Sequence, residues 1–348
     1  MIFTALGIWM LGWANLQPQH EGIQRLITEI RAGQHGEVHG LLVSRAGRLI
    51  TETYFDKNPA LPALIGTPGG LHMIQSSTKS VNSLLVCIAM DRGLFTPDTT
   101  LAEIFADHYA IHDDLKAIPI RHLLSMRDGI DWKQWADLPR DQLDHVIQQE
   151  QPDYIAYALR KPAAHAPGTR FNYSDTAALL TAAAIRLRAD QSVKEFARIH
   201  LFEPLGINEV HWLIKDQTGL AHTGAGLRLY ARDFLKIGEL VLGKGSYRGN
   251  RIIQEATLNQ ALQPHSENVF KKPNALMQGM GYGWFWWLRP HEGENLVLAM
   301  GRGEQSLLVS YKHRTVVVTT GWNEAREHRA QIIRFFRDHI VAKEAQDD

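Results

Sequence analysis

The chain has 348 residues, more than a single hydrophobic core usually holds, so we expect two packed regions or one domain with a large insertion. Lysine plus arginine and aspartate plus glutamate both number 37, so the formal net charge at pH 7 is zero. This balance creates no overall field that would attract nucleic acid or an anionic membrane surface, and neither partner is expected.

The apolar segment from Met1 to Ala14 resembles a secretory signal, because it ends in Gly12-Trp13-Ala14, with small residues two apart as at a cleavage site, and is too short to span a bilayer. No lysine or arginine precedes it, so an N-terminal extension or a misplaced start codon is the alternative. We expect residues 1–19 to be a signal peptide or an extension. Export to the periplasm or the extracellular space is the preferred location, with the cytoplasm left open.

The next segment predicts a helix followed by two strands. Apolar residues from Ile23 to Ile30 recur at helical spacing, and Gly33 ends this amphipathic helix. Residues 38–44 and 49–55 have strand composition, and the short glycine-containing segment between them predicts a hairpin.

The middle of the chain is predominantly helical, and Cys87, its one cysteine, lies in an apolar run there. A disulfide is therefore excluded, and a buried thiol is expected. The clearest helical runs are residues 120–126, 177–187 and 231–242.

Strand composition returns near the C-terminus, at residues 284–287, 296–298, 307–311 and 316–320. Asn323 is expected to cap a closing helix whose apolar positions run from Ile332 to Ile340.

Strands at both ends of the chain predict an α+β fold, in which one antiparallel sheet built from both chain ends carries flanking helices and an inserted, mainly helical subdomain. The expected divisions are residues 20–75 with 265–348 for the sheet part and 76–264 for the insertion. A ligand site is expected between the two parts.

Ser76-Ser77-Thr78-Lys79 precedes a buried helical run that ends near Gly93, so Ser76 is expected near a helix N-terminus. Residues three apart lie on one helix face, which brings the Lys79 amine within reach of the Ser76 hydroxyl. A serine nucleophile needs such a base, and a partly desolvated lysine can serve. A capping serine beside a surface lysine is the structural alternative.

Two further segments contain candidate site residues. Tyr173-Ser174-Asp175 lies just before the helix near residue 177, where a phenol beside an amine could relay a proton, although a packed aromatic and a helix cap would look the same. In the segment 299–305, small residues on an inner strand would permit a ligand to approach the backbone closely, and a bulged strand is the alternative.

Taken together, these segments resemble the serine β-lactamase and penicillin-binding protein superfamily, especially its class C-like branch of esterases, D-aminopeptidases and aminohexanoate-oligomer hydrolases. Residues 76–80 resemble its nucleophile motif, and 173–175 stand where it has Tyr-x-Asn. Residues 118–126 and 202–207 resemble two of its recurrent segments. The likeness covers roughly residues 20–340.

The resemblance implies a serine hydrolase without a cofactor. Ser76 would be the acylated nucleophile, Lys79 its base and Tyr173 the proton shuttle toward the leaving group. The backbone N–H groups of Ser76 and of a residue near Gln305 would form the oxyanion hole. An ester, an amide or a short peptide is the implied substrate. A β-lactamase or D,D-peptidase proper is one alternative, and a catalytically inactive peptide-binding module is another.

The pattern departs from the superfamily at two places. Asp175 replaces asparagine, and a carboxylate there would raise the pKa of Lys79, which is the wrong direction for a base. Arg302-Gly303-Glu304 replaces Lys-Thr-Gly or His-x-Gly. We hypothesise that Arg302 compensates by pairing with Asp175 or by lying near Lys79; alternatively, it binds a substrate carboxylate. Glu304, two residues on, is expected on the same strand face, where it would neutralise Arg302 or attract a substrate amine, unless it faces solvent.

Other site types have weaker support. His108, His112 and Asp113 lie close together but lack the spacing of a metal site, and no metal is expected. The aromatic run 284–287 could line a subsite, although strand packing explains it equally. The G-x-S-x-G motif of α/β-hydrolases is missing from the sequence.

Overall fold

The computed structural model describes residues 17–61, 65–270, 274–325 and 328–341. The apolar segment Met1 to Ala14, expected to be a signal, lies outside the described residues. Among the residues that are described, no helix has both the length and the apolar character needed to cross a membrane.

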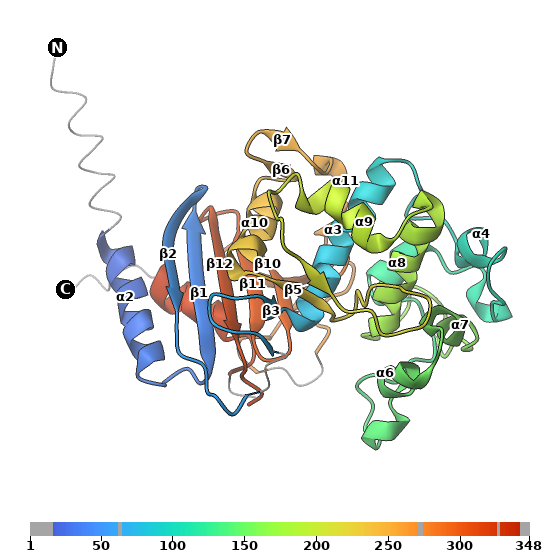
Figure 1. Ribbon diagram of the computed structural model, residues 1–348, viewed down its shortest axis with the longest axis horizontal. Coiled ribbons are helices and arrows are strands. Elements are labelled where there is room, and N and C mark those ends of the chain that lie inside the picture. The colour runs from blue at the N-terminus through green and yellow to red at the C-terminus, as the bar shows by residue number, and fades with distance from the viewer. Residues whose placement is uncertain (1–16, 62–64, 271–273, 326–327, 342–348) are drawn as a thin grey trace, which may run out of the picture.

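One antiparallel sheet is the centre of the fold, with strand order β2-β1-β12-β11-β10-β9-β8. The N-terminal hairpin β1–β2 joins the C-terminal strands through β12, with Leu42 opposite Val318 and Val43 opposite Val317. The sheet is therefore built from both chain ends, as predicted (Figure 1). Its strands are β1 (Val38–Arg45), β2 (Arg48–Tyr54), β8 (Gly281–Tyr282), β9 (Trp287–His291), β10 (Glu294–Gly301), β11 (Gln305–Ser310) and β12 (Thr315–Gly321).

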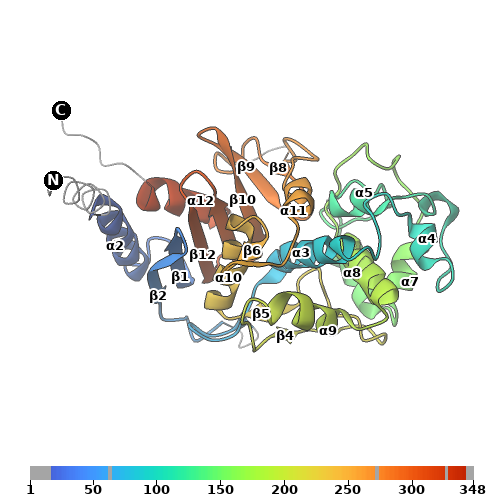
Figure 2. The same ribbon diagram turned by 90° about the horizontal axis from the view of Figure 1, so that it is seen from above.

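Helices cover both faces of this sheet, as Figure 2 shows. On one face, α12 (Gln331–Phe335) and the π-helical turn η8 (Phe336–Ile340) lie beside α2 (Gln17–Arg31). On the other face, α10 (Ala231–Leu242) packs on β11 and β12. A Cβ added at Gly238 of α10 would lie 2.4 Å from a Val316 methyl, so this glycine permits the close packing.

The helical part lies beside the sheet, at the end away from α2 in both views (Figures 1 and 2). Its helices are α3 (Thr78–Asp91), α4 (Leu101–Phe105), α5 (Ile120–Leu124), α6 (Asp144–Ile147), α7 (Tyr154–Leu159), α8 (Asp175–Ala189), α9 (Val193–Ala197), η6 (Arg198–Phe202) and α11 (Glu255–Ala261), with 3-10 turns η2 (Gln75–Ser77), η3 (Asp113–Leu115), η4 (Arg140–Gln142) and η5 (Gln148–Glu150). Short strands are β3 (His72–Met73), β4 (His211–Trp212), β5 (Leu227–Leu229), β6 (Ser246–Tyr247) and β7 (Asn250–Arg251).

The central helix α3 is buried along almost its whole length, and two of its polar side chains, Ser80 and Asn82, donate hydrogen bonds to neighbouring elements. Asn82 donates to the Ala178 carbonyl at 3.1 Å and to the Thr181 hydroxyl at 2.9 Å, both on α8. Ser80 donates to the Phe285 carbonyl at 2.7 Å. Because buried polar groups need such partners, these bonds fix the position of α3 between the helical part and the sheet.

Two sequence predictions about the C-terminal part are wrong. Residues 284–286 do not form a strand, because Phe285 has a left-handed φ of 58° and the chain bends between β8 and β9. Asn323 does not cap the closing helix, which starts only at Gln331. Its side chain instead accepts from the Glu37 N–H at 2.6 Å and donates to the His35 carbonyl.

The predicted α+β class, with an antiparallel sheet and flanking helices, is confirmed. The boundaries at residues 76 and 264 stay a prediction. Within that range, α10 packs on the sheet rather than on the other helices of the predicted insertion.

Candidate active site

Ser76 lies in the 3-10 turn η2, directly before α3, and this turn contacts strands β10 and β11 of the sheet. It is partly exposed, although the three residues after it are buried. Gln75, just before it, adopts a left-handed φ of 51°, which is uncommon for a non-glycine residue and occurs often at functional sites. A Cβ at Gly301 would lie 2.3 Å from the Ile74 carbonyl oxygen, so the end of β10 approaches this backbone closely.

Lys79, one turn along α3, is fully buried and points at Ser76. Its Nζ lies 3.3 Å from the Ser76 Oγ and 2.7 Å from the Gly224 carbonyl oxygen, and it forms an ion pair with Asp175. An ammonium group has three hydrogens to donate, so these three acceptors match its full capacity. The geometry therefore holds Lys79 in one position between the nucleophile candidate and a carboxylate.

The charges around Lys79 determine its protonation. Burial disfavours its ammonium form, but the Asp175 carboxylate and the Tyr173 hydroxyl outweigh that effect and raise the pKa of Lys79. Burial likewise opposes the charge on Asp175, but the neighbouring ammonium lowers the pKa of this carboxyl. Both members of the pair are therefore ionised at neutral pH. The rise in the pKa of Lys79 is the one expected from a carboxylate, rather than an asparagine, at position 175.

Asp175 is the first residue of α8, and Ser174 is the cap, since its hydroxyl accepts from the Ala177 N–H at 3.2 Å. The Asp175 N–H donates to the Gln134 side-chain oxygen at 2.6 Å, which ties α8 to the loop between α5 and η4. His222 also lies near this carboxylate, and burial lowers the pKa of its imidazole to about 4. His222 is therefore neutral at physiological pH.

Tyr173 is buried and its ring lies beside the Lys79 amine, which is 4.7 Å from the ring centroid. The ring is stacked with two tryptophans: Trp135 has a centroid separation of 4.3 Å and Trp287 one of 5.8 Å. Trp135 is 60% exposed. An exposed indole therefore covers one of the residues next to Lys79, a position where it could also contact a substrate.

The turn from Gly301 to Gln305 joins β10 to β11 beside Ser76. Ser77 donates to the Gln305 carbonyl at 2.7 Å, which fixes β11 next to η2. The Gln305 side chain is fully buried and donates to the Gly321 carbonyl. Because its side chain is used in this way, Gln305 can contact a substrate at Ser76 only through its backbone.

The structure contradicts two predicted contacts of Arg302 and Glu304, whereas their predicted part in substrate binding stays a prediction. Arg302 is exposed and donates through Nε to Glu324 at 2.6 Å, so the expected pairing with Asp175 is wrong. Glu304 does not share a strand face with Arg302, because Gly303 and Glu304 have φ values of 81° and 65° in a tight turn rather than in an extended strand. Its carboxylate accepts from the Gln331 N–H at 3.2 Å, and burial raises its pKa to about 7.

The structure adds three residues that sequence patterns did not indicate, namely Gly224, Gln134 and Trp135. The Gly224 carbonyl accepts a hydrogen bond from Lys79, the Gln134 side chain accepts one from Asp175, and the Trp135 ring stacks on Tyr173. A carbonyl contact leaves no residue-type signal, and the loop that carries Gln134 and Trp135 matches no motif. The two tryptophans at 132 and 135 among polar residues are the indication that the sequence offers for this loop. His108 and His112 are exposed, as expected, and Cys87 is buried, with its thiol pKa raised by burial.

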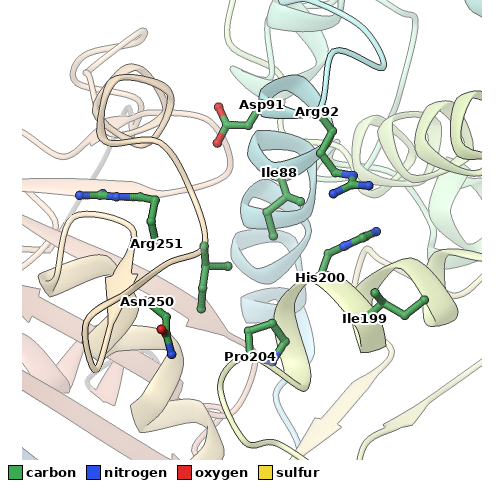
Figure 3. Close-up of a pocket in the computed structure, with 9 residues that line it drawn as sticks. Ile88, Asp91, Arg92, Ile199, His200, Pro204, Asn250 and Arg251 are labelled. Carbon is green, nitrogen blue, oxygen red and sulfur yellow. The ribbon is translucent and has the colours of Figure 1, made fainter.

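A separate pocket of about 310 Å³ lies at the opposite end of α3 from Ser76 (Figure 3). Ile88, Asp91 and Arg92 of α3 line it together with His200 and Arg251. Since none of the predicted catalytic residues lines this pocket, it is distinct from the candidate active site.

The family model described as Beta-lactamase matches residues 23–334, which is most of the chain. This chain belongs to the beta-lactamase family. A search of curated proteins found no match.

Solved structures of low sequence identity share the beta-lactamase family fold. A penicillin-binding protein homologue from Caulobacter crescentus is 13% identical, with a TM-score of 0.72 and coverage of 92% of this chain and 96% of that chain. An octameric penicillin-binding protein homologue from Pyrococcus abyssi is 19% identical, with a TM-score of 0.69 and coverage of 91% and 75%. A family VIII carboxylesterase is 14% identical, with a TM-score of 0.71 and coverage of 91% and 96%.

Proposed function

We propose that this member of the beta-lactamase family is a serine hydrolase that cleaves an ester or amide through an acyl-enzyme on Ser76. The observation that carries the proposal is the 3.3 Å distance between the Lys79 Nζ and the Ser76 Oγ. That distance allows direct proton transfer between an alcohol and its base. The family match and the partial exposure of Ser76 support it further.

In the proposed reaction, the Ser76 Oγ bonds to the acyl carbon while its proton passes to the neutral amine of Lys79. Tyr173 then carries this proton from the Lys79 ammonium to the leaving alcohol or amine as the bond to the acyl carbon breaks. Water adds to the acyl-enzyme, and the acid is released with the Ser76 hydroxyl restored. Because Asp175 stabilises the ammonium, the reactive neutral lysine is a minority form at neutral pH.

The negative charge on the attacked carbonyl oxygen needs N–H donors. The backbone N–H of Ser76 and one from the turn before β11 are the proposed pair. The Ser77 bond to the Gln305 carbonyl holds these two segments together, which would preserve their spacing during the reaction.

An ester or amide substrate is favoured over β-lactam or stem-peptide hydrolysis because the Lys-Thr-Gly strand motif is absent from the position of Arg302-Gly303-Glu304. The likeness to a family VIII carboxylesterase is compatible with this preference. Hydrolysis of a β-lactam or a D,D-peptide stays the alternative within the same chemistry.

A second candidate function is a peptide-binding module without turnover. The ion pair between Lys79 and Asp175 favours it, because an ammonium group cannot accept the serine proton. The two functions differ in whether Ser76 becomes covalently modified.

Covalent labelling separates them. Intact protein and a Ser76→Ala variant are incubated with a fluorophosphonate, and their masses are compared. The proposal predicts one added phosphonyl group per chain, located on Ser76 and missing from the variant. Folded protein that stays unlabelled over a range of pH would support the binding module and reject the hydrolase.

A further inference from the structure

Three potential metal ligands meet on the side of the sheet away from Ser76. Glu29 comes from α2, His35 from the segment after it and His339 from η8 near the other end of the chain. Their ligand atoms all lie within 4.8 Å of one another. From this cluster we infer a divalent transition-metal site, best suited to Zn²⁺, that joins the N-terminal helix to the C-terminal turn.

Two of the three distances between the ligand atoms resemble those of a tetrahedral site. Zn²⁺ bonds to nitrogen and oxygen are about 2.0–2.2 Å long, which places two ligands of a tetrahedron about 3.4 Å apart. The His339 Nε2 lies 3.4 Å from the Glu29 Oε2, and the His35 Nε2 lies 2.9 Å from the same oxygen. Small side-chain rotations would therefore admit a metal ion, with water as the fourth ligand.

The burial of the two imidazoles also supports a metal site. His35 is 7% exposed and His339 is 8% exposed, and the Nδ1 atom of each is buried without a hydrogen-bond partner among the described residues. Both rings therefore direct their one polar contact to the centre of the cluster. Two imidazoles and one carboxylate form a ligand set that zinc uses in proteins.

The backbone around the cluster is closely packed. A Cβ at Gly22 of α2 would lie 2.2 Å from the carbonyl oxygen of His339, so the helix and the turn are in direct contact there. His339 also lies in a π-helical turn, a rare conformation that occurs frequently at functional sites. An ion bound here would link two segments about 300 residues apart in sequence and would stabilise the fold without touching Ser76.

Metal binding to the full chain tests the inference. Chelator-treated protein is titrated with Zn²⁺ by calorimetry and with Co²⁺ by visible absorption. One equivalent of each should bind, cobalt should give the intense bands of four-coordinate geometry, and the melting temperature should rise with Zn²⁺. Glu29→Gln and His339→Gln should each weaken zinc binding on the order of 100-fold or more, since even the outer partners of a metal ligand contribute 10–100-fold.

His108→Gln is the matched control, because this exposed histidine lies outside the cluster and its loss should leave binding unchanged. Glu29→Gln retains the side-chain length and an acceptor oxygen, so it reports on the charge of the ligand rather than on folding. The inference is overturned if wild-type protein binds no stoichiometric metal, if cobalt stays six-coordinate, or if the control loses as much affinity as the cluster variants.

Discussion

The buried ammonium of Lys79 forms an ion pair with Asp175 and lies 3.3 Å from the Ser76 hydroxyl oxygen. In the proposed reaction, this ion pair determines when Lys79 can accept the serine proton. The carboxylate stands where related proteins are expected to have an uncharged amide. It raises the pKa of Lys79, whereas catalysis by a neutral amine needs that pKa to be low. Acylation by this protein should therefore become faster as the pH rises and the lysine loses its proton.

Replacing Asp175 with asparagine should release Lys79 from its charged partner. We expect the pKa of Lys79 to fall, and the acylation rate at pH 7 to increase on the order of tenfold. The measurement is the rate of fluorophosphonate labelling from pH 5 to pH 10, whose rising limb should move to lower pH in Asp175→Asn.

Arg302→His is the control for this prediction. Because Arg302 pairs with the exposed Glu324, its replacement should leave the labelling profile of either background unchanged. A double variant that differs from Asp175→Asn alone would show that Arg302 acts on the Lys79 pair after all.

The same ion pair should give a defined pH range of stability. The pKa of Lys79 is higher in the folded protein than its value of 10.5 in the unfolded chain. The stability that Lys79 contributes to folding is therefore fully present below pH 10.5 and is lost as the pH rises through the folded pKa. The folded pKa of Asp175 is lowered, so its contribution is present above 3.8 and is lost as pH falls through the folded pKa. Removing only the amine, in Lys79→Met, should cost about 3–5 kcal/mol in unfolding free energy at pH 7.

Lys79→Met with Asp175→Asn should be less destabilised than Lys79→Met, since no unpaired carboxylate stays buried. Urea unfolding of the three proteins at pH 7 measures this difference. Equal destabilisation of Lys79→Met and the double variant would mean that the unpaired carboxylate of Asp175 is not the source of the cost, which would contradict this prediction.

Glu304 should make stability depend on pH in the direction opposite to that of Asp175. Burial raises its pKa to about 7 from an ordinary value of 4.5, so folding favours the protonated acid. Stability from this group is highest below pH 4.5 and falls as the pH rises to about 7, by up to about 3 kcal/mol. Glu304→Gln should remove this decline in urea unfolding experiments, whereas Glu324→Gln, at an exposed site, should retain it.

Trp135 should hold the Tyr173 ring in position rather than stabilise the hydrophobic core. Aromatic stacking provides about 0.5–1.5 kcal/mol, and Trp135 is 60% exposed, so Trp135→Ala should lower the unfolding free energy by about 1 kcal/mol. Acyl transfer should slow several-fold and recover in Trp135→Phe, which keeps a ring against Tyr173. Leu138→Ala, in the same loop and exposed, should change neither; a loss above 3 kcal/mol in Trp135→Ala would place the indole in the core.

The contact between Lys79 and Ser76 could be predicted because it depends on helical spacing alone, and both residues lie within one turn. The sheet could be predicted because strand composition recurs at both chain ends. Tyr173 and Asp175 were found through the resemblance to a family, and their proximity to Lys79 needed the packing of α8 on α3.

The rest could not be read from local patterns. The turn at residues 302–304 was interpreted as strand, because a left-handed Glu304 has no signature in residue type. Asn323 matched the preferences of a helix cap, but a tertiary hydrogen bond to Glu37 uses its side chain instead. The cluster of Glu29, His35 and His339 joins opposite chain ends, so sequence spacing gave no indication of it.

The most direct measurement of the central claim is the pre-steady-state release of nitrophenol from p-nitrophenyl acetate. An acyl-enzyme on Ser76 predicts a burst of one nitrophenol per chain, which should be absent in Ser76→Ala and on the order of 100-fold slower in Lys79→Gln. A burst of equal size and rate in Ser76→Ala would contradict the assignment of the nucleophile, and an unchanged rate in Lys79→Gln would contradict the assignment of the base.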